Sequence, residues 1–434
     1  MELLPSLLVY GIPFILAAGA YLFLKERASS RAAAIYQEAK EAGLTEPASL
    51  HPVIDPALCC GSAACVSACP EGDVIGIIRG KAQLIDPTLC IGHGACAAAC
   101  PTKAISLVFG TKTRGVELPL VTPEFETSVP GIFIAGELGG MGLIRNAVNQ
   151  GQQAVTAVHR LRGKAPRGML DLVIVGAGPA GLSASLAAKS LGMHFTTIEQ
   201  EKMGGTIAHY PRGKVVMTKP AILPIVGATR FSEISKEGLL DFWSDAIAQA
   251  GLKIEYDHDL VAIRQQTDGF LVETSQQTFE ARSVLLAIGR RGTPRKLDVP
   301  GEDLSKVVYR LEAPEQFDGQ DVLVVGGGDS ALEAAASLVE ETSARVLLSY
   351  RGDAFQRARR KNRERITSAE ANGRLKVLLQ SNVSEIQPNA VILEQDGSRF
   401  KLANDAVIVC AGGVLPTGLL RDMGVTVVMK YGEP

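Results

Sequence analysis

Two glycine-rich turns constrain the fold of this chain more than any other feature of its sequence. The first lies in LDLVIVGAGPAGLSASL, where Gly176, Gly178 and Gly181 follow an apolar run, and Glu199 ends the next apolar run. Glycines at this spacing permit a tight strand-to-helix turn and a close approach of the backbone to a pyrophosphate. An acid about 20 residues later binds ribose hydroxyls. The segment therefore predicts a dinucleotide-binding βαβ fold.

A second glycine-rich turn follows about 150 residues later, in VLVVGGGDSALEAAASL. The next apolar run ends in Tyr350 and Arg351 without an acid, and a basic stretch follows. An arginine where NAD sites carry Asp or Glu is the expected arrangement for a 2′-phosphate, so this turn predicts NADPH over NADH. The residues predicted to bind it are Gly326, Gly328, Asp329, Ser330, Ala331, Arg351 and Arg357.

Length and composition agree with an α/β protein of several domains. The chain has 434 residues, which at roughly 150 per domain suggests about three domains. Hydrophobic residues make up 46% and charged residues 21%, a mix that excludes disordered and collagen-like chains. Because the net charge is only −2, there is no basic field for nucleic acid, and we expect no nucleic-acid partner.

Seven of the eight cysteines lie between Cys59 and Cys100, in two half-repeats 31 residues apart. Each half-repeat ends in C-x3-C-P and is followed by a short apolar run, VIGIIRG or AISLVFG. The arrangement resembles the bacterial two-cluster ferredoxin, whose run is C-x2-C-x2-C-x3-C-P. The resemblance implies two iron-sulfur clusters, each 4Fe-4S or 3Fe-4S. A structural zinc site or disulfides are the alternatives.

In the ferredoxin family the fourth cysteine of each run ligates the other cluster. The implied ligands are Cys59, Cys65 and Cys100 for one cluster, and Cys69, Cys90 and Cys96 for the other. Ser62 and His93 stand where each run should carry its second cysteine. Three outcomes are open for the iron atom that lacks a cysteine in each cluster. The side chain of Ser62 or His93 ligates it, water or an outside ligand does, or the iron is absent and a three-iron cluster remains. We favour ligation by His93. Ser62 is a poor iron ligand, and the adjacent Cys60 either swings in or stays a free thiol.

Residues 114 to 434 resemble the two-dinucleotide flavoprotein reductases of the low-molecular-weight thioredoxin-reductase type, in particular their bacillithiol-disulfide-reductase-like branch. The resemblance rests on the two turns, on the Gly-Gly-Thr after the first, and on the AIG that ends at Gly289. It implies FAD in the first fold, NADPH in the inserted second fold, and Gly205, Thr206 and Gly289 as further cofactor contacts. The expected fold class is α/β with two Rossmann-like domains, an α+β dicluster ferredoxin module and one N-terminal transmembrane helix.

Two departures from that family have consequences. No cysteine lies between Cys100 and Cys410, so the chain lacks the C-x-x-C disulfide of thioredoxin reductases. The flavin-binding segment TSVPG-(apolar)-AGD, which ends the family's chains, occupies residues 127–158, ahead of the first turn, with Glu137 in place of the Asp. This order indicates a circular permutation, in which Gly136 and Glu137 contact the flavin and Pro434 lies near residues 110–116.

Residues 3–24 carry no charge, and as a helix they are long enough to cross a hydrocarbon core of about 30 Å. Lys25, Arg27 and Arg31 follow, so the positive-inside tendency predicts a single-pass anchor in the bacterial inner membrane with the catalytic part in the cytoplasm. A signal peptide would need basic residues before the run, and a buried hairpin would need a partner segment.

The predicted divisions are an anchor (3–24), a stalk and linker that act as a spacer (25–52), the iron-sulfur domain (53–109), the permuted FAD segment (110–168), the FAD domain (169–292), the NADPH domain (293–405) and a return to the FAD domain (406–434).

Together these parts predict a membrane-anchored oxidoreductase. We expect electrons to pass between NADPH, FAD, two clusters and an unknown acceptor or donor that is itself a protein, because a flavin can divide the electron pair of a hydride between one-electron carriers. No catalytic acid or base is predicted, since hydride transfer requires none. A thiol-disulfide reductase and an electron-transfer subunit of a larger membrane complex are the alternatives, and a homodimer is left open.

Overall fold

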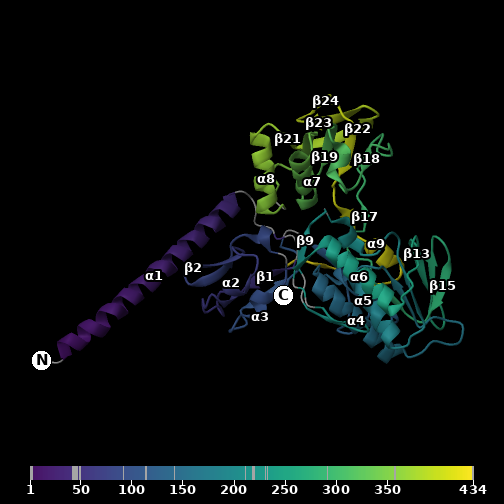
Figure 1. The fold of residues 1–434 in the computed structure, drawn as a ribbon, viewed down its shortest axis with the longest axis horizontal. Helices are drawn as coiled ribbons and strands as arrows, with labels where there is room; N and C mark the ends of the chain where they lie inside the picture. The colour runs from purple at the N-terminus through teal and green to yellow at the C-terminus, as the bar shows by residue number, and fades with distance from the viewer. Residues whose placement is uncertain are drawn as a thin grey trace. The chain divides into compact units, whose positions relative to one another are not determined.

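The structure is a computed structural model of the chain (Figure 1). Its residues divide into two compact units. The first unit comprises Met1–Gly115, Ala354–Lys361 and Tyr431–Pro434, and the second Val116–Asp353 and Asn362–Lys430. The structure describes residues 3–41, 47, 50–90, 92–112, 115–140, 142–210, 212–217, 220–229, 231, 233–290, 292–355 and 358–432, without the side chains of 3–10, 217 and 293. The predicted site residue Arg357 and the terminal Pro434 lie outside the described residues.

In the first unit, two antiparallel strand pairs enclose the cysteine loops. β1 (His51–Ile54) pairs with β4 (Ile105–Val108), and β2 (Ile75–Ile78) pairs with β3 (Lys81–Leu84). The short helices α2 (Ala64–Ala68) and α3 (Ala95–Ala98) and the 3-10 turn η1 (Pro87–Leu89) lie between them in the chain. Because β1 precedes the first cysteine run and β4 follows the second, their pairing brings the two half-repeats together.

A single helix, α1 (Leu3–Glu41), spans the predicted anchor and most of the predicted stalk. Its C-terminal half packs against β2, where Ala32 and Ala39 are buried. Gly76 permits the contact, because a Cβ there would lie 2.6 Å from the Cβ of Ala32. Arg31 adds an ion pair with Asp73 at 2.6 Å. The stalk was therefore wrongly predicted as a spacer: its small side chains dock on the iron-sulfur domain.

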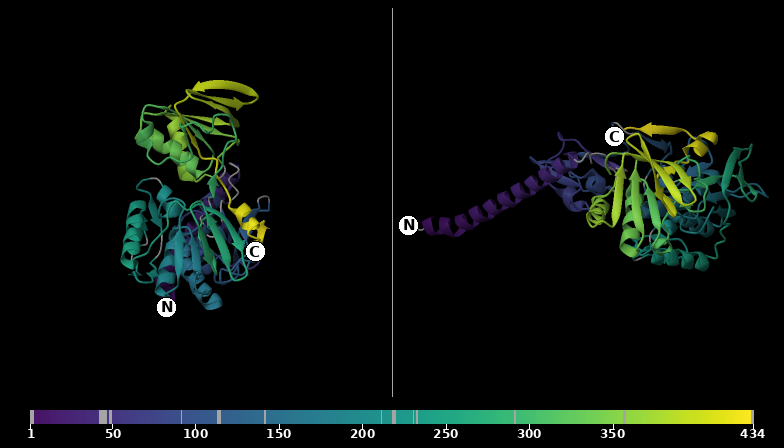
Figure 2. Two further views of the ribbon diagram at one scale, coloured as in Figure 1. Left: turned by 90° about the vertical axis from the view of Figure 1, so that its right-hand side faces the viewer. Right: turned by 90° about the horizontal axis from the view of Figure 1, so that it is seen from above.

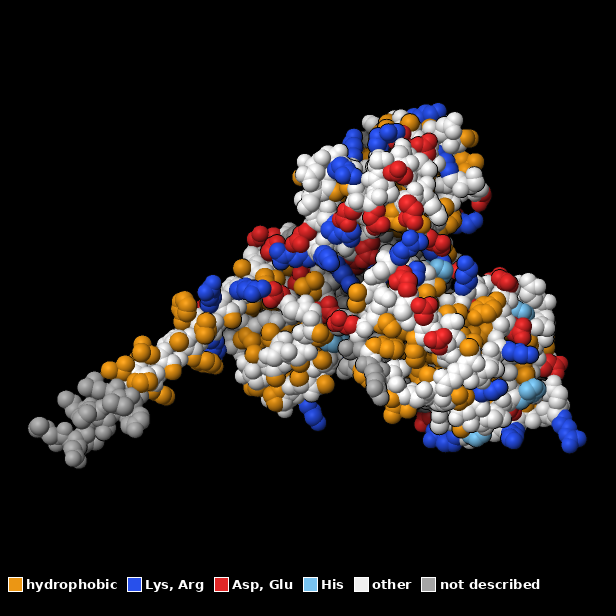
Figure 3. Space-filling model, viewed as in Figure 1, with side chains coloured by type: hydrophobic (Ala, Val, Ile, Leu, Met, Phe, Trp, Pro, Cys, Tyr) orange, Lys and Arg blue, Asp and Glu red, His pale blue; other side chains and the backbone are white. Residues whose placement is uncertain are grey.

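The N-terminal half of α1 is apolar, and its large described side chains are exposed, including Phe14 (74%) and Phe23 (66%) (Figure 3). In the part of the chain that the structure describes, no helix combines the length and hydropathy needed to cross a membrane. The predicted span at 3–24 is therefore unsupported, and the side chains of its first eight residues are outside the described part.

The first parallel sheet of the second unit has the order β6-β16-β7-β8. Its strands are Ile132–Ile134, Val284–Leu286, Leu172–Val175 and Phe195–Ile198. Helix α4 (Ile144–Arg162) packs closely on α5 (Pro179–Ser190), because a Cβ on Gly151 would lie only 2.1 Å from the carbonyl oxygen of Ala180. Around these lie α6 (Lys236–Ala250), the antiparallel sheet β13-β14-β15 (Leu260–Gln265, Phe270–Thr274, Thr278–Ala281), and the short pairs β9–β12 (Val215–Met217, Glu233–Ser235) and β10–β11 (Ile222–Leu223, Gly227–Ala228).

The second parallel sheet, whose strands are coloured green to yellow in Figure 2, has the order β18-β25-β19-β20-β21. Its strands are Val307–Val308, Ala406–Val409, Asp321–Val325, Arg345–Tyr350 and Leu375–Leu379. Helix α7 (Asp329–Glu341) packs on β19 and β20, and α8 (Arg360–Ala371) is joined to α7 by an ion pair between Arg365 and Glu340 at 2.7 Å. The antiparallel sheet β22-β23-β24 (Ser381–Gln387, Ala390–Gln395, Ser398–Ala403) follows. The chain passes from the first parallel sheet to the second and back again, and β17 (Thr293–Pro294) and β26 (Gly413–Val414), which lie in these two connections, pair with each other.

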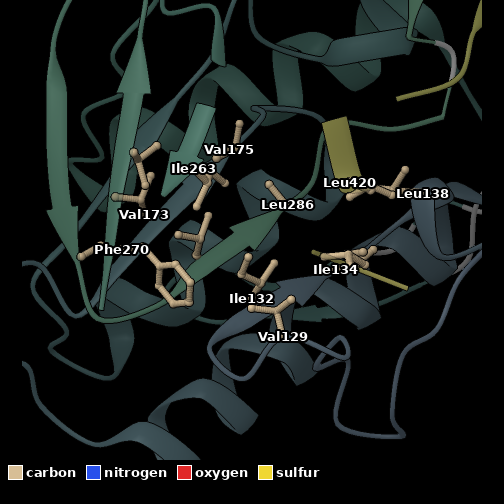
Figure 4. Packing of buried hydrophobic residues seen from close by; sticks show 14 of the residues in the cluster. Val129, Ile132, Ile134, Leu138, Val173, Val175, Ile263, Phe270, Leu286 and Leu420 are labelled. Carbon is tan, nitrogen blue, oxygen red and sulfur yellow. The ribbon is translucent and has the colours of Figure 1, made fainter. Parts of the chain in front are cut away.

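Segments from three distant parts of the sequence share the hydrophobic core under the first sheet (Figure 4). Ile132 and Ile134 come from β6, Val173 and Val175 from β7, and Leu420 from α9 (Thr417–Asp422). Each of these side chains is at most 4% exposed. The 127–158 segment is therefore an integral part of this domain although it precedes the first glycine turn in the chain.

The last strand closes the second unit. β27 (Val427–Lys430) pairs antiparallel with β5 (Val116–Pro119), with Lys430 opposite Val116. On β5, Glu117 accepts a hydrogen bond from the Thr417 hydroxyl at 2.9 Å and forms an ion pair with Arg421, and these contacts lower the pKa of Glu117, the Arg421 hydrogen bond most. The C-terminal strand thus lies beside residues 116–119, although Pro434 itself is not described.

Candidate metal centres and dinucleotide sites

The first cysteine pocket, as we call it, holds about 280 Å³ of empty space including its open mouth. Its polar lining comprises Cys59, Cys60, Cys65 and Cys100 together with Ser62 and Thr102. Cys100 belongs to the second half-repeat, so the fourth cysteine crosses over as the ferredoxin resemblance implies. This pocket brings together the whole first predicted ligand set.

The second cysteine pocket has the same empty volume of about 280 Å³. Cys69 reaches it from the first half-repeat and meets Cys90 and Cys96 of the second. His93 and Glu71 also line it. The second predicted ligand set, His93 included, therefore surrounds one pocket. Within the described residues, no three His, Cys, Asp or Glu side chains are arranged to hold a single metal ion.

The two ligand loops have matching backbone conformations. Gly61 and Gly92 have φ values of 70° and 74°, and Ala63 and Gly94 have values of 61° and 80°. The left-handed region costs a residue with a Cβ about 1–2 kcal/mol, yet Ala63 adopts it. The shared conformation places Ser62 and His93 at equivalent points of the two loops.

Backbone N–H groups point at the sulfurs of the first pocket. Ala82 N–H donates to Cys59 Sγ at 3.4 Å, and Ala104 N–H donates to Cys100 Sγ at 3.3 Å. Lys81 Nζ donates to the carbonyl oxygen of Cys59 at 2.7 Å. Hydrogen bonds to cluster sulfurs and nearby charge are among the factors that set a cluster's reduction potential.

Burial controls the protonation of most of these thiols. It raises the pKa of Cys90 to about 11, and it also raises the pKa values of Cys65, Cys69 and Cys96. At Cys100 burial acts in the same direction, but hydrogen bonds from Thr102 and nearby amides outweigh it and lower the pKa. Because iron binds the thiolate, each of these buried thiols would have to release its proton to serve as an iron ligand.

The first glycine turn brings the FAD-side residues together. A Cβ on Gly181 would lie 1.8 Å from the carbonyl oxygen of Gly176, and a Cβ on Gly205 would lie 3.2 Å from the Cα of Gly178. Glu199 is 7% exposed and accepts a hydrogen bond from Ala177 N–H at 2.6 Å. Burial raises the pKa of Glu199, against hydrogen bonds from backbone amides that lower it. The predicted acid thus contacts the turn itself.

The segment ahead of this turn contributes to the same site. Gly136 lies beside α5, where a Cβ would be 3.1 Å from the Cβ of Ala180, and its N–H donates to Gln150 Oε1 at 2.8 Å. Glu137 begins the 3-10 turn η2 (Glu137–Gly139). Gly289 and Thr206, at the start of η3 (Gly205–His209), are also neighbours: a Cβ on Gly289 would lie 4.0 Å from Thr206 Oγ1. The structure therefore gathers the predicted FAD-side positions around one turn.

The second glycine turn carries a different set of side chains. Gly326 has a φ of 144°, and Ala331 is buried in α7 at the third fingerprint position. Asp329 accepts a hydrogen bond from Asn362 Nδ2 at 2.8 Å, and Ser330 is exposed. Arg351 is exposed directly after β20, and no ion pair is found for it among the described residues. The arginine that the sequence predicts for the 2′-phosphate is therefore an exposed cation at the end of β20.

Some residues at these sites were not predicted from the sequence. The Tyr350 ring packs over the second turn, since a Cβ on Gly327 would lie 2.4 Å from it. Glu71 and Thr102 line the cysteine pockets, and Gln150 holds Gly136. The position of Thr102 two residues after Cys100 was a usable signal. The other contacts depend on long-range packing that spacing does not reveal.

The family model described as "Pyridine nucleotide-disulphide oxidoreductase" matches residues 173–433, more than half of the chain. The chain belongs to this family. A model described as "4Fe-4S dicluster domain" matches residues 51–101, which hold both cysteine loops. This oxidoreductase is therefore an FAD-dependent NAD(P)H enzyme with an iron-sulfur domain, as the sequence predicts.

Relatives of this oxidoreductase match its flavoprotein part. A ferredoxin–NADP reductase of Ignicoccus hospitalis is 31% identical over 253 residues, which cover 56% of this chain and 77% of that protein. Bacilliredoxin reductase Bdr of Bacillus subtilis is 25% identical, with 60% of this chain and 82% of that protein covered. The structure of bacillithiol disulfide reductase Bdr from Staphylococcus aureus is 24% identical, with a TM-score of 0.52 over 59% of this chain and 81% of that one, a likeness of fold.

Proposed function

We propose that this oxidoreductase transfers electrons between NADPH and a protein acceptor or donor, using a bound FAD and two iron-sulfur clusters. The observation that carries the proposal is the pair of cysteine pockets on a chain that also holds two dinucleotide turns. Each pocket is lined by the three cysteines of one predicted ligand set, drawn from both half-repeats, and the first pocket has Cys60 as a fourth. A flavin, when bound, accepts the two electrons of a hydride and releases them singly, which is how iron-sulfur clusters accept them.

The residues present fit these groups. Cysteine thiolates hold iron-sulfur clusters, and each pocket supplies at least three cysteines, with His93 as the imidazole that would complete the second set. Around the first turn, the glycines leave room for a pyrophosphate, and the buried Glu199 carboxylate would accept hydrogen bonds from ribose hydroxyls. At the second turn, Arg351 would bind the 2′-phosphate of NADPH, and Arg357 is proposed for the same role from its sequence position.

We also propose that the flavoprotein part is circularly permuted. β6 and α4 precede the first glycine turn in the chain, yet β6 pairs with β16 in the sheet of that turn and α4 packs on α5, the helix that follows the turn. β5, which precedes β6 in the chain, pairs with the last strand, β27. The family match begins at residue 173, after this segment, and leaves about a fifth of Bdr uncovered. A chain in the usual order would follow if residue 430 were joined to residue 116.

An anaerobic titration with NADPH tests the electron path. We expect flavin bleaching, followed by absorbance, to be accompanied by reduced-cluster EPR signals in the same samples. A variant that carries Cys65→Ala and Cys96→Ala should show the bleaching without these signals, whereas Arg399→Ala on β24, outside both pockets, should behave like the wild type. Bleaching with intact clusters that stay oxidised would contradict flow from NADPH to the clusters and favour entry from a reduced partner.

A thiol-disulfide reductase is the second candidate function, because the relatives include proteins named bacilliredoxin reductase and bacillithiol disulfide reductase. No cysteine lies between Cys100 and Cys410 to serve a flavin-linked disulfide. NADPH oxidation that depends on a small disulfide and survives Cys90→Ala and Cys96→Ala would favour this function. If the wild type oxidises NADPH no faster with a small disulfide than without one, this function is excluded.

Attachment to a membrane is a further proposal. It is supported by the uncharged run 3–24 and by the exposed large apolar side chains of its described part. We expect the full chain to sediment with membranes and to need detergent for release. The variant Ile15→Lys with Phe23→Lys should move to the supernatant, because charge at these positions opposes insertion. A wild-type chain recovered in the supernatant would contradict the proposal.

A further inference from the structure

We propose that Cys60, and not Ser62, is the fourth ligand of the cluster in the first cysteine pocket. The inference rests on the proposed presence of a cluster there. The two cysteine pockets differ at this point, since the second has three cysteines and His93, whereas the first has four cysteines and Ser62. A complete set of four thiols is therefore present in the first pocket, although the spacing of the motif hides it.

Ser62 occupies the expected corner but is a poor donor for iron. Its loop matches the loop of His93 in backbone conformation, so position alone would favour it. Its hydroxyl oxygen, however, accepts a hydrogen bond from Ala64 N–H, at 3.5 Å, at the start of α2. Iron-sulfur clusters are held by soft thiolates, and a neutral hydroxyl does not replace one well. Ser62 therefore serves the helix start, and the corner needs another donor.

The backbone on both sides of Cys60 is fixed at the pocket. Cys59 N–H donates to the carbonyl oxygen of Asp55 at 3.0 Å, and the Cys59 carbonyl oxygen accepts from Lys81 Nζ at 2.7 Å. Gly61 abuts the β2–β3 turn so closely that a Cβ would lie 2.2 Å from the carbonyl oxygen of Gly80. Cys60 is thus held between two anchored residues, and it belongs to the lining of the pocket.

Exposure distinguishes Cys60 from the other cysteines of this pocket. Cys59 and Cys65 are buried and Cys100 is half-buried, whereas Cys60 is exposed. An exposed free thiol beside iron would be open to oxidation and alkylation. Ligation would engage that sulfur, so the pocket's most accessible cysteine would complete the ligand set.

Iron content and EPR of the anaerobically reconstituted full chain test the assignment. We expect Cys60→Ala to lose about one iron per chain and to show the signal of an oxidised three-iron cluster, since one corner has lost its thiolate. Ser62→Ala, the matched control, should keep the wild-type iron content and spectrum. The reverse result, or no change in either variant, would overturn the proposal.

Protection from alkylation tests the same point without a substitution. We expect Cys60 of the reconstituted wild type to resist iodoacetamide and to react after the iron is stripped, as read by peptide mass spectrometry, with buried Cys65 as the reference for a ligand. Equal labelling of Cys60 before and after stripping would overturn the proposal. A wild type that assembles no cluster at all would instead refute the proposed function, so the two failures are distinguishable.

Discussion

The two dinucleotide turns of this oxidoreductase share their backbone and differ in their side chains. In each, the first glycine faces the residue that follows a neighbouring parallel strand. A Cβ on Gly176 would lie 2.6 Å from the carbonyl oxygen of Ala287 after β16, and a Cβ on Gly326 would lie 2.4 Å from that of Cys410 after β25. The two turns are thus built by the same close approach of strands, independent of what they bind.

The differences lie at the third fingerprint position and at the end of the next strand. The first turn needs Gly181, whereas the second accepts Ala331. The first has the buried carboxylate of Glu199, whereas the second has Tyr350 and the exposed Arg351. The comparison indicates that glycine spacing defines a pyrophosphate site and that one charged residue selects the dinucleotide.

Replacement of Gly181 by alanine should have the largest effect, because the added Cβ would lie 1.8 Å from the Gly176 carbonyl oxygen. We expect a loss of about 3 kcal/mol in the free energy of unfolding and purified protein without flavin. The flavin-to-protein absorbance ratio and urea unfolding measure these. Ala331→Gly, the matched change in the second turn, should cost only about 1 kcal/mol and keep the flavin. A Gly181→Ala protein with full flavin would break the comparison.

Arg351→Ala should separate the two nicotinamide cofactors. A hydrogen bond to a charged group contributes about 1.5–3 kcal/mol, so the KM for NADPH should rise roughly 10- to 100-fold while the KM for NADH stays unchanged. Steady-state kinetics with both cofactors measure this. Arg399→Ala, which removes an exposed ion pair with Glu394 on the β23–β24 hairpin, is the control. An equal rise for both cofactors would show that Arg351 does not recognise the 2′-phosphate.

Glu199→Gln tests the carboxylate of the first turn. The amide keeps the shape of the side chain but removes the charge that strengthens hydrogen bonds to it. We expect the Kd for FAD to rise about tenfold, measured by flavin fluorescence during release. Glu273→Gln on β14, far along the chain from the turn, should leave the Kd unchanged. Unaltered FAD binding by Glu199→Gln would remove the charged residue from the explanation of the first site.

The smallest expected effect is a pH dependence of the flavin-free protein. Burial raises the pKa of Glu199 above its ordinary value of 4.5, so the folded state binds the proton more tightly than the unfolded state does. The contribution of Glu199 to stability is then present below pH 4.5 and is lost as the pH rises through the raised pKa. Relative to Glu199→Gln, the wild-type Tm should fall over this range. Parallel Tm profiles of the two proteins would contradict it.

Short-range motifs account for what the sequence predicted well. Glycine spacing identified both turns because each turn is formed within one strand-turn-helix segment. The cysteine repeat gave both pocket linings, including the crossing of Cys69 and Cys100, because the ferredoxin resemblance carries that pairing with it. The placement of β6 and α4 beside the first turn was likewise anticipated from the TSVPG and AGE residues of the segment.

Features that depend on packing between distant segments were missed. The docking of α1 on β2 rests on Ala32, Ala39 and the missing side chain of Gly76, and small residues give no periodic signal in the sequence. The same holds for the Tyr350 ring over Gly327. The apolar run 3–24 suggested a membrane span from composition alone, and the described part of α1 does not support it.

The pairing of β5 with β27 also determines where this protein can be shortened. β5 is the strand partner of β27 among the described residues, and Met429 of β27 is already 46% exposed. These two strands form a sheet of their own, so a fragment that starts after Pro119 would leave β27 without a strand partner. Its unpaired N–H and C=O groups would be a template for aggregation between copies. A fragment that starts before Val116 keeps that partner. The four residues of β5, at the start of the second unit, therefore determine whether the last strand of that unit has a partner.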